Sequence, residues 1–309
     1  MHSNGTAPKL GALLTAMVTP FDAAGEVDLR EAVRIARYLV EEGSHGLVVA
    51  GTTGESPALS DDEKVALFRE VRKAIGPRAT VVAGTGGNNT RHSVELTRRA
   101  EECGVDAALA VVPYYNKPTQ DGMLLHFGAI AEATALPIIV YNIPSRTGAN
   151  MLPETLLELA RRHGNIAGVK ESSGDCAQFS KILRDRREGF SFWSGDDHLF
   201  LPSLALGGDG LISVASHVCG RELREMLDAY KQGDVARASE IHLSLSALFA
   251  ALFTTTSPIP VKWAMNRLGF ACGPCRSPLG AMPEASQALL EPLLERYRER
   301  TRARLAAVS

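Results

Sequence analysis

Lys170 is the side chain in this sequence that is best placed for catalytic chemistry, because it directly follows the apolar run 166–169. A lysine whose stem is buried at the end of a strand loses solvation, and its pKa moves from about 10.4 toward about 7–8. The neutral amine attacks carbonyl carbons and forms Schiff bases. A lysine that only reaches the surface from this position is the plain alternative. Lys170 is therefore our candidate nucleophile.

Two further segments carry groups suited to anionic substrates. Residues 51–56 read GTTGES, in which the glycines expose backbone N–H groups and Thr52 and Thr53 add hydroxyl donors. The segment suits a carboxylate or a phosphate, or it is an ordinary polar turn; it lacks the Gly-Lys-Ser/Thr of a P-loop. Tyr141 ends another apolar run as a candidate acid or base, and Arg146 offers a two-pronged donor for a carboxylate. A solvated loop arginine is the alternative.

Other motifs are less specific. Tyr114 and Tyr115 stand between prolines, where they could stack, relay protons or simply pack at a site or subunit boundary. Residues 84–89 (GTGGNN) lack the third glycine of a dinucleotide turn, and residues 194–198 (SGDDH) fit a turn and helix cap better than a metal site. Cys272 and Cys275 have redox-like spacing but no thioredoxin-like context. We expect no metal and no cofactor.

The elements that must position these groups alternate along the chain. Short β-branched apolar runs recur about every 20–34 residues, each followed by an amphipathic stretch such as 28–42. Eight such units predict an α/β protein with a (β/α)8 TIM barrel, although a doubly wound open sheet also alternates. The expected strands are 12–18, 46–50, 80–84, 107–112, 137–141, 166–170, 190–193 and 210–214.

Helix signals support this division. Ser60 and Glu63 form the pattern of a capping box, and Thr90 is the expected cap of the next helix. Beyond residue 220 only helical periodicity appears, at about 222–232, 234–253, 259–268 and 284–305. We therefore expect a barrel in residues 1–220 that carries the active site, and a C-terminal helical appendage in residues 221–309. Barrel active sites lie at the carboxyl ends of the strands, which is where the candidate groups stand.

Composition excludes several classes of protein. The chain has 309 residues, a formal net charge of −2, 45% hydrophobic and 22% charged residues. A nearly neutral chain offers no basic footprint for nucleic acid and no charged tail for a membrane surface, and its composition is not that of a disordered chain. Five cysteines do not suggest a disulfide framework, and the run 10–18 suits a strand better than a signal peptide. We expect a cytoplasmic protein.

Together the segments resemble one family. GTTGE at 51–55, YYNKP at 114–118, YNIPSRTG at 141–148, GVKE at 168–171 and SGDD at 194–197 occur in the order and spacing of the class I pyruvate-dependent lyases, the family of dihydrodipicolinate synthase and N-acetylneuraminate lyase. The resemblance extends into the appendage at 258–262 (PIPVK). It implies a TIM barrel in which a lysine forms a Schiff base with pyruvate.

The resemblance also implies a role for each candidate. Lys170 would attack the pyruvate ketone, and Tyr141 would shuttle protons. Thr53 and Tyr115 would complete the proton relay, with Tyr115 reaching in from a neighbouring subunit. The pyruvate carboxylate would be held by Thr52 and Thr53, and backbone groups of Gly195 and Ile212 would line the pocket. No cofactor or metal would be needed, since the iminium is itself the electron sink.

Two details favour the synthase branch, in which pyruvate condenses with L-aspartate 4-semialdehyde in lysine and diaminopimelate biosynthesis. One is the Thr-Thr loop, and the other is Arg146, which matches the arginine that binds the second carboxylate. A pyruvate-releasing aldolase or dehydratase acting on a sugar-derived 2-oxo acid is the first alternative. The second is a pyruvate-binding sensor or scaffold, although Lys170 and Tyr141 are both retained.

The resemblance implies an assembly and a regulatory site as well. A shared Tyr115 requires at least a dimer, and we expect a homotetramer built as a dimer of dimers. In lysine-inhibited relatives, lysine binds in a cleft at the dimer interface, and this sequence keeps matching residues at Ser56, Asn88 and Tyr114. The glutamate that binds the effector ammonium is replaced by His92, and Asp61 and Lys64 stand where histidines are frequent. We expect weak or absent inhibition by lysine.

Overall fold

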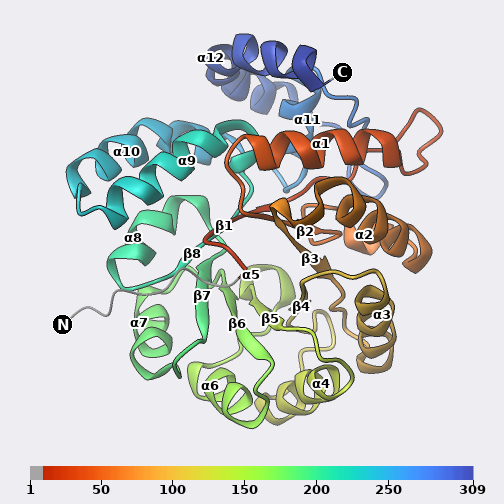
Figure 1. The fold of residues 1–309 in the computed structure, drawn as a ribbon, viewed down its shortest axis with the longest axis vertical. Coiled ribbons are helices and arrows are strands. Elements are labelled where there is room, and N and C mark those ends of the chain that lie inside the picture. Colours follow the sequence, from red (N-terminus) through yellow and green to blue (C-terminus); the bar gives the residue numbers. More distant parts are fainter. Residues whose placement is uncertain (1–9, 309) are drawn as a thin grey trace.

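Parallel strands form the centre of the molecule, which is a computed structural model that describes residues 10–308. Within these residues eight strands close into a barrel in simple sequence order, β1 to β8, with β8 pairing back onto β1 (Figure 1). The predicted (β/α)8 TIM barrel is therefore confirmed. The strands are β1 (Leu13–Ala16), β2 (Gly46–Val49), β3 (Thr80–Gly84), β4 (Ala107–Val111), β5 (Ile138–Asn142), β6 (Ile166–Glu171), β7 (Ser191–Ser194) and β8 (Gly210–Ser213). Each lies within two residues of its expected range, the usual uncertainty at element ends.

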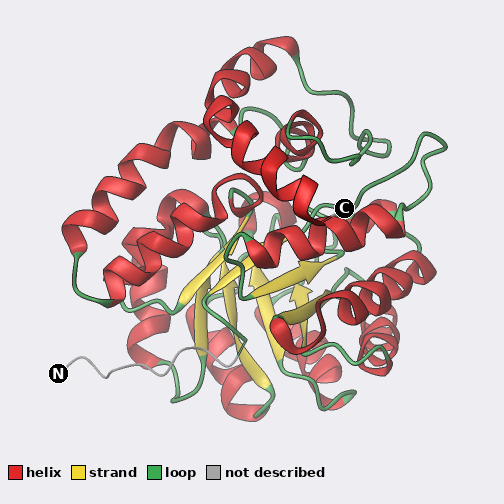
Figure 2. Cartoon of the chain, turned by 45° about the horizontal axis from the view of Figure 1, so that its top comes forward, coloured by secondary structure: helices red, strands yellow, loops and turns green. Residues whose placement is uncertain are grey.

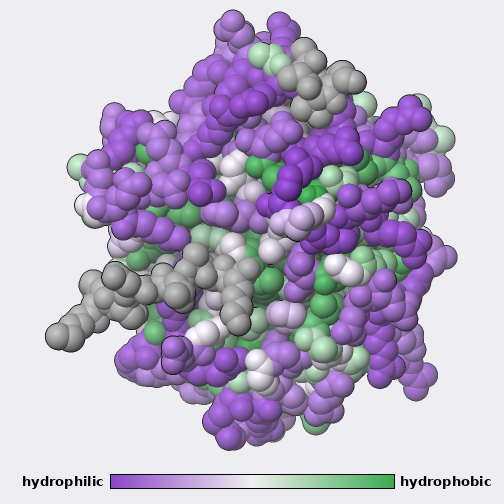
Figure 3. All heavy atoms as spheres, viewed as in Figure 1, coloured by the Kyte–Doolittle hydropathy of each residue, from purple (hydrophilic) through white to green (hydrophobic). Residues whose placement is uncertain are grey.

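Helices connect the strands and enclose the barrel (Figure 2). A short helix, α5 (Pro144–Thr147), and 3₁₀ turns at Ser56–Ala58, Gly76–Arg78 and Asp197–Leu199 occupy loops. Polar side chains cover much of the outer rim, and apolar ones show between them (Figure 3). The helices around the barrel are α1 (Leu29–Glu41), α2 (Asp61–Ile75), α3 (Thr90–Glu102), α4 (Gln120–Glu132), α6 (Pro153–Arg162), α7 (Cys176–Asp185), α8 (Phe200–Ala205) and α9 (Ser216–Lys231).

Local capping explains where two of these helices begin. The capping box of α2 is present, with Ser60 accepting from the Glu63 backbone and Glu63 accepting from the Ser60 backbone. The predicted cap of α3 was wrong by one residue. Asn89 caps this helix by accepting from the backbone N–H of His92 at 3.1 Å, while the Thr90 hydroxyl contacts Nδ1 of His126 at 2.9 Å. The side chain that reaches the exposed N–H groups belongs to the residue before the first helical turn.

The C-terminal part of the chain is helical, as its periodicity predicted. It contains α10 (Val235–Ala251), α11 (Ile259–Arg267) and α12 (Glu284–Val308), which pack against one another and against α1 and α9. The expected boundary at residue 220 falls inside α9, which follows β8 and also contacts β1. We keep the division into barrel and appendage as a proposal. In residues 10–308 no helix has the length and apolar character needed to cross a membrane.

Apolar side chains fill the barrel from within. Trp193 is almost fully buried there, and its indole N–H donates to the Gly11 carbonyl at 2.9 Å. A side chain at Gly168 would collide with this indole, so the glycine leaves room for it. The apolar cluster inside the barrel consists of Leu10, Leu14, Ala16, Val48, Val82, Ala107, Leu109, Ile139, Tyr141, Ile143, Trp193 and Ile212.

Candidate active site

Lys170 lies at the carboxyl end of β6 with its side chain enclosed. The residue is 4% exposed, and Nζ lies 4.2 Å from the centroid of the Tyr141 ring. Burial lowers the pKa of Lys170 to about 8; Asp196 and Asp197 act against this shift, and Arg146 adds to it. Desolvation is the cause that makes a lysine amine nucleophilic near neutral pH. The position and environment therefore fit the expected nucleophile.

Tyr141 faces Lys170 because of an irregularity between β5 and β6. Ile138 pairs with Ile166, but Ile139 pairs with Gly168, so one residue of β6 is skipped. This shift brings Tyr141 opposite Lys170; regular pairing would place Tyr141 opposite Val169, whose side chain points the other way. Burial raises the pKa of Tyr141 to about 12, so the phenol is protonated at neutral pH and can donate a proton.

Gly195 and Ile212 lie beside this pair. A side chain at Gly195 would meet Cε of Lys170 at 2.9 Å and collide with Oγ of Ser172, so only glycine allows β7 and β6 to approach this closely. Ile212 is fully buried in the same interior layer as Tyr141. Their backbone contacts with substrate remain predictions.

The loop after β2 is tightly folded. The Glu55 N–H donates to the Thr52 carbonyl at 3.0 Å, and the Ser56 N–H donates to the Gly51 carbonyl at 3.2 Å. Thr53 is buried, whereas Thr52 is partly exposed and borders a cavity. The turn thus presents hydroxyl and backbone groups at the carboxyl end of the barrel.

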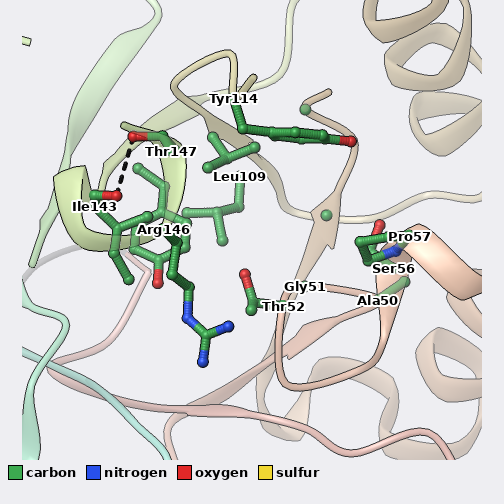
Figure 4. Close-up of a pocket in the computed structure, with 14 residues that line it drawn as sticks. Ala50, Gly51, Thr52, Ser56, Pro57, Leu109, Tyr114, Ile143, Arg146 and Thr147 are labelled. Carbon is green, nitrogen blue, oxygen red and sulfur yellow. Dashed lines mark hydrogen bonds between the residues drawn. The ribbon is translucent and has the colours of Figure 1, made fainter. Parts of the chain in front are cut away.

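The cavity has a volume of about 220 Å³, suited to a small metabolite. Thr52 and Arg146 border it from different loops, and Tyr114 lies at its edge (Figure 4). Arg146 belongs to α5, and its guanidinium donates to the Ser257 carbonyl at 3.1 Å. The lining residues are Ala50, Gly51, Thr52, Ser56, Pro57, Gly84, Gly86, Leu109, Val111, Tyr114, Tyr141, Ile143, Arg146 and Thr147.

Tyr115 is not brought into this cavity by its own chain. It is 89% exposed and has a left-handed backbone with φ of 73°, whereas its neighbour Tyr114 borders the cavity. A non-glycine residue with positive φ is uncommon, and so is a tyrosine this exposed. The expected role of Tyr115 in a neighbouring subunit stays a prediction.

The acidic segment after β7 forms a turn, as expected, but the Asp196 side chain does not cap the 3₁₀ turn that follows. Asp197 is buried and accepts from the Ser213 hydroxyl and from the N–H groups of Val214 at 3.2 Å and Ala215 at 3.0 Å. Its carboxylate therefore fixes the loop that follows β8.

Cys272 and Cys275 lie between α11 and α12. Both are free, and burial raises the pKa of each thiol. Raised pKa values are the opposite of what a redox thiol needs.

Two features of the site were not predicted from the sequence. The Ser172 hydroxyl is buried next to Gly195 and finds no hydrogen-bond partner among the described residues. Glu55 forms a buried ion pair with Lys262 of α11, with Nζ 2.6 Å from Oε1. The Ser172 hydroxyl could have been predicted, because it stands two residues after the lysine at the strand end. The Glu55–Lys262 pair joins residues 207 positions apart, and a single sequence does not predict such a contact.

Fold and site together define a class of protein: a (β/α)8 barrel with a buried lysine beside a tyrosine at the carboxyl end of its strands. Comparison with known proteins makes this specific. A model described as the dihydrodipicolinate synthetase family matches residues 9–297, and the chain belongs to this family. It is 55% identical to the 4-hydroxy-tetrahydrodipicolinate synthase of Moorella thermoacetica over 286 residues, 92% of this chain and 98% of that relative. Its identity to the synthase of Symbiobacterium thermophilum is 52%, over 93% of this chain and 98% of that relative.

Solved structures agree with this assignment. A dihydrodipicolinate synthase from Bacillus anthracis has a TM-score of 0.90 at 42% identity, covering 93% of this chain and 98% of its own. The enzyme from Cyanidioschyzon merolae, solved with lysine bound, has a TM-score of 0.90 at 44% identity, covering 92% and 96%.

Proposed function

We propose that this chain condenses pyruvate with L-aspartate 4-semialdehyde to give 4-hydroxy-tetrahydrodipicolinate, the first committed step of diaminopimelate and lysine biosynthesis. The observation that carries the proposal is the buried Lys170 amine, 4.2 Å from the Tyr141 ring and with a pKa lowered to about 8. The curated relatives that match nearly the full length of the chain bear the name of this lyase. They favour it over the aldolase, the dehydratase and the pyruvate sensor.

The reaction begins at the lysine amine. Neutral Lys170 attacks the ketone carbon of pyruvate, and Tyr141 donates a proton to the departing hydroxyl, so that water leaves and an iminium remains. The iminium withdraws electrons, and a methyl proton leaves to give an enamine. The enamine carbon then attacks the semialdehyde carbonyl, whose oxygen takes up a proton. The amino group of the acceptor attacks the iminium carbon, closes the ring and releases Lys170.

Charged groups of the substrates match groups of the site. Thr52 and Thr53, with the backbone N–H groups of their turn, hold the pyruvate carboxylate, and Arg146 holds the carboxylate of the semialdehyde. Gly195 and Ile212 line the pocket through their backbones. Because the Lys170 iminium is the electron sink, these steps need neither a cofactor nor a metal.

Proton transfer uses a shared relay. Thr53 connects Tyr141 to Tyr115, which comes from a neighbouring subunit, so the active unit is at least a dimer and the assembly is a homotetramer of two such dimers. The exposed Tyr115 side chain supports this arrangement. The partners are small-molecule substrates, with no nucleic acid and no membrane. Free thiols at all five cysteines suit a reducing cytoplasm.

A coupled assay tests the proposal. Purified dihydrodipicolinate reductase consumes NADPH as product forms from pyruvate and aspartate semialdehyde. Turnover that Lys170→Ala and Arg146→Ala abolish is the expected result. Borohydride reduction with pyruvate must also add a pyruvate-sized mass to Lys170. An adduct without turnover would mean that the acceptor is wrong, and pyruvate release from sugar-derived 2-oxo acids would then be measured. Absence of the adduct would exclude the Schiff-base mechanism.

A further inference from the structure

One short segment of the C-terminal appendage touches both of the loops assigned to substrate carboxylates. We propose that residues 257–262, which lead into α11 and form its first turn, position the Thr52–Thr53 turn and Arg146 together, so that the appendage contributes directly to the active site. This inference rests on the proposed function, since it concerns the groups that bind the two substrates there.

The first connection is a buried ion pair between α11 and the turn after β2. Nζ of Lys262 lies 2.6 Å from Oε1 of Glu55, and the two side chains are 2% and 1% exposed. Lys262 also lies 4.0 Å from the centroid of the Phe21 ring. Removing one member of such a pair leaves an uncompensated buried charge, so the position of α11 and that of Glu55 are strongly coupled.

Glu55 transmits this coupling to the turn through its own backbone. It adopts a left-handed conformation with φ of 57°, and its N–H closes the turn onto Thr52. A non-glycine residue keeps such a conformation only when its surroundings hold it there. The surroundings here are the appendage, because the second carboxylate oxygen of Glu55 accepts from the Arg276 N–H at 2.8 Å.

Arg276 secures the far side of the same loop. Its guanidinium donates to the Ala58 carbonyl at 2.9 Å and pairs with Glu63 of α2 at 2.5 Å. The loop is therefore held by the appendage at Glu55, just after the two threonines, and again at the end of the 3₁₀ turn that follows. Thr52 itself still borders the cavity.

The second connection runs to Arg146. Its guanidinium donates to the Ser257 carbonyl, five residues before Lys262 in the same segment. Among the described residues, this is the one hydrogen bond that the Arg146 side chain makes. The residue is otherwise exposed. One segment thus sets the separation between the two carboxylate-binding groups. Lys170 is held independently by β6, so its reactivity does not require α11.

The test separates positioning from stability. Glu55→Gln/Lys262→Met removes both charges and keeps side-chain volume, and Glu55→Gln alone keeps an oxygen for Lys262. Arg221→Met is the control, because it removes a different ion pair of the fold, the 3.0 Å contact between Arg221 of α9 and the buried Glu42 at the end of α1. For each full-length variant we measure KM and kcat for both substrates and the melting temperature. We also measure borohydride trapping at saturating pyruvate.

We expect the double variant to raise KM for pyruvate and for aspartate semialdehyde by about tenfold each, with kcat within about threefold and the Lys170 adduct retained. Glu55→Gln should raise both KM values by about threefold. If the double variant does not fold, the KM values of Glu55→Gln test the proposal instead. The control should lower the melting temperature without changing either KM.

The proposal is overturned if both Glu55 variants keep both KM values within about twofold of wild type while they lose thermal stability as the control does. A wild-type protein that forms no pyruvate adduct would instead overturn the proposed function.

Discussion

Nζ of Lys170 lies 4.2 Å from the centroid of the Tyr141 ring, and a one-residue irregularity between β5 and β6 places the two residues opposite each other. The ring face stabilises a cation, whereas burial disfavours it. Burial is the larger effect, since the pKa of Lys170 falls to about 8. The amine is thus poised between its charged and neutral forms under physiological conditions.

Imine formation should therefore follow the titration of Lys170. At pH 7 about one amine in ten is neutral with a pKa of about 8, compared with about one in 2,500 for an ordinary lysine. We expect the rate of adduct formation with pyruvate, measured by rapid quench with borohydride, to rise through pH 8 and then level off. A rate that keeps rising to pH 10 would contradict the lowered pKa.

The same shift affects folding stability in a defined direction. Between pH 8 and about 10.4 the unfolded chain holds a proton on Lys170 that the folded chain has lost, so the free energy of unfolding rises with pH in this window. Lys170→Met should lack this increase. Denaturant unfolding of both proteins at pH 8 and pH 10 measures the difference, and equal slopes for the two would exclude the effect.

Tyr141→Phe should reduce kcat by about 10²–10³ while leaving the fold intact, because it removes the proton donor but keeps the ring under Lys170. The coupled assay and thermal unfolding measure the two properties side by side. A variant with near wild-type turnover would remove Tyr141 from the proton relay.

Gly195→Ala should damage the site by steric overlap with Lys170 and Ser172. We expect a loss of about 1–3 kcal/mol in unfolding free energy, together with slower adduct formation. Gly164→Ala is the matched control, because nothing lies within 4 Å of a side chain there and its φ is not left-handed. If the two variants behave alike, close packing at Gly195 has no functional role.

The shared relay predicts complementation between two damaged subunits. Lys170→Ala and Tyr115→Phe should each have low activity alone, but co-refolded mixtures should regain activity, because a mixed dimer contains one site with an intact Lys170 and a partner's intact tyrosine. The coupled assay at increasing ratios measures the recovery. If mixing restores nothing although hybrid oligomers form, as native mass spectrometry would show, Tyr115 acts within its own chain or not at all.

One cleft contains Ser56, Asn88 and Tyr114, the residues that we match to the lysine-binding site of inhibited relatives, and Asp61, Lys64 and His92 line it as well. Nε2 of His92 lies 2.7 Å from Asp61, and Nζ of Lys64 lies 3.6 Å from the same carboxylate. Lys64 repels a cationic effector, and Asp61 already has partners, so we expect less than half-maximal inhibition at millimolar lysine. His92→Glu should strengthen inhibition by restoring an acceptor for the ammonium. Half-maximal inhibition of the wild type at micromolar lysine would defeat this expectation.

Much of the architecture was predictable because it depends on local patterns. The β-branched runs and the amphipathic stretches between them have the periods of strands and helices, and simple alternation of eight units leads to a closed barrel. Strand-end placement then marked Lys170, Tyr141 and the Thr52–Thr53 turn, because barrels gather the carboxyl ends of their strands. The cap of α3 was missed because Asn89 and Thr90 are adjacent good caps, and only backbone conformation distinguishes them.

Residue type, order and periodicity were enough to predict the fold class, the family and the candidate groups of the site. How these groups lie relative to one another depends on the folded structure. The irregularity that aligns Tyr141 with Lys170, the contact that requires glycine at 195 and the Glu55–Lys262 pair depend on the register and separation of elements far apart in the chain. Burial, which lowers the pKa of Lys170, is likewise a property of the packed barrel, because desolvation comes from the neighbours that the fold brings around the amine.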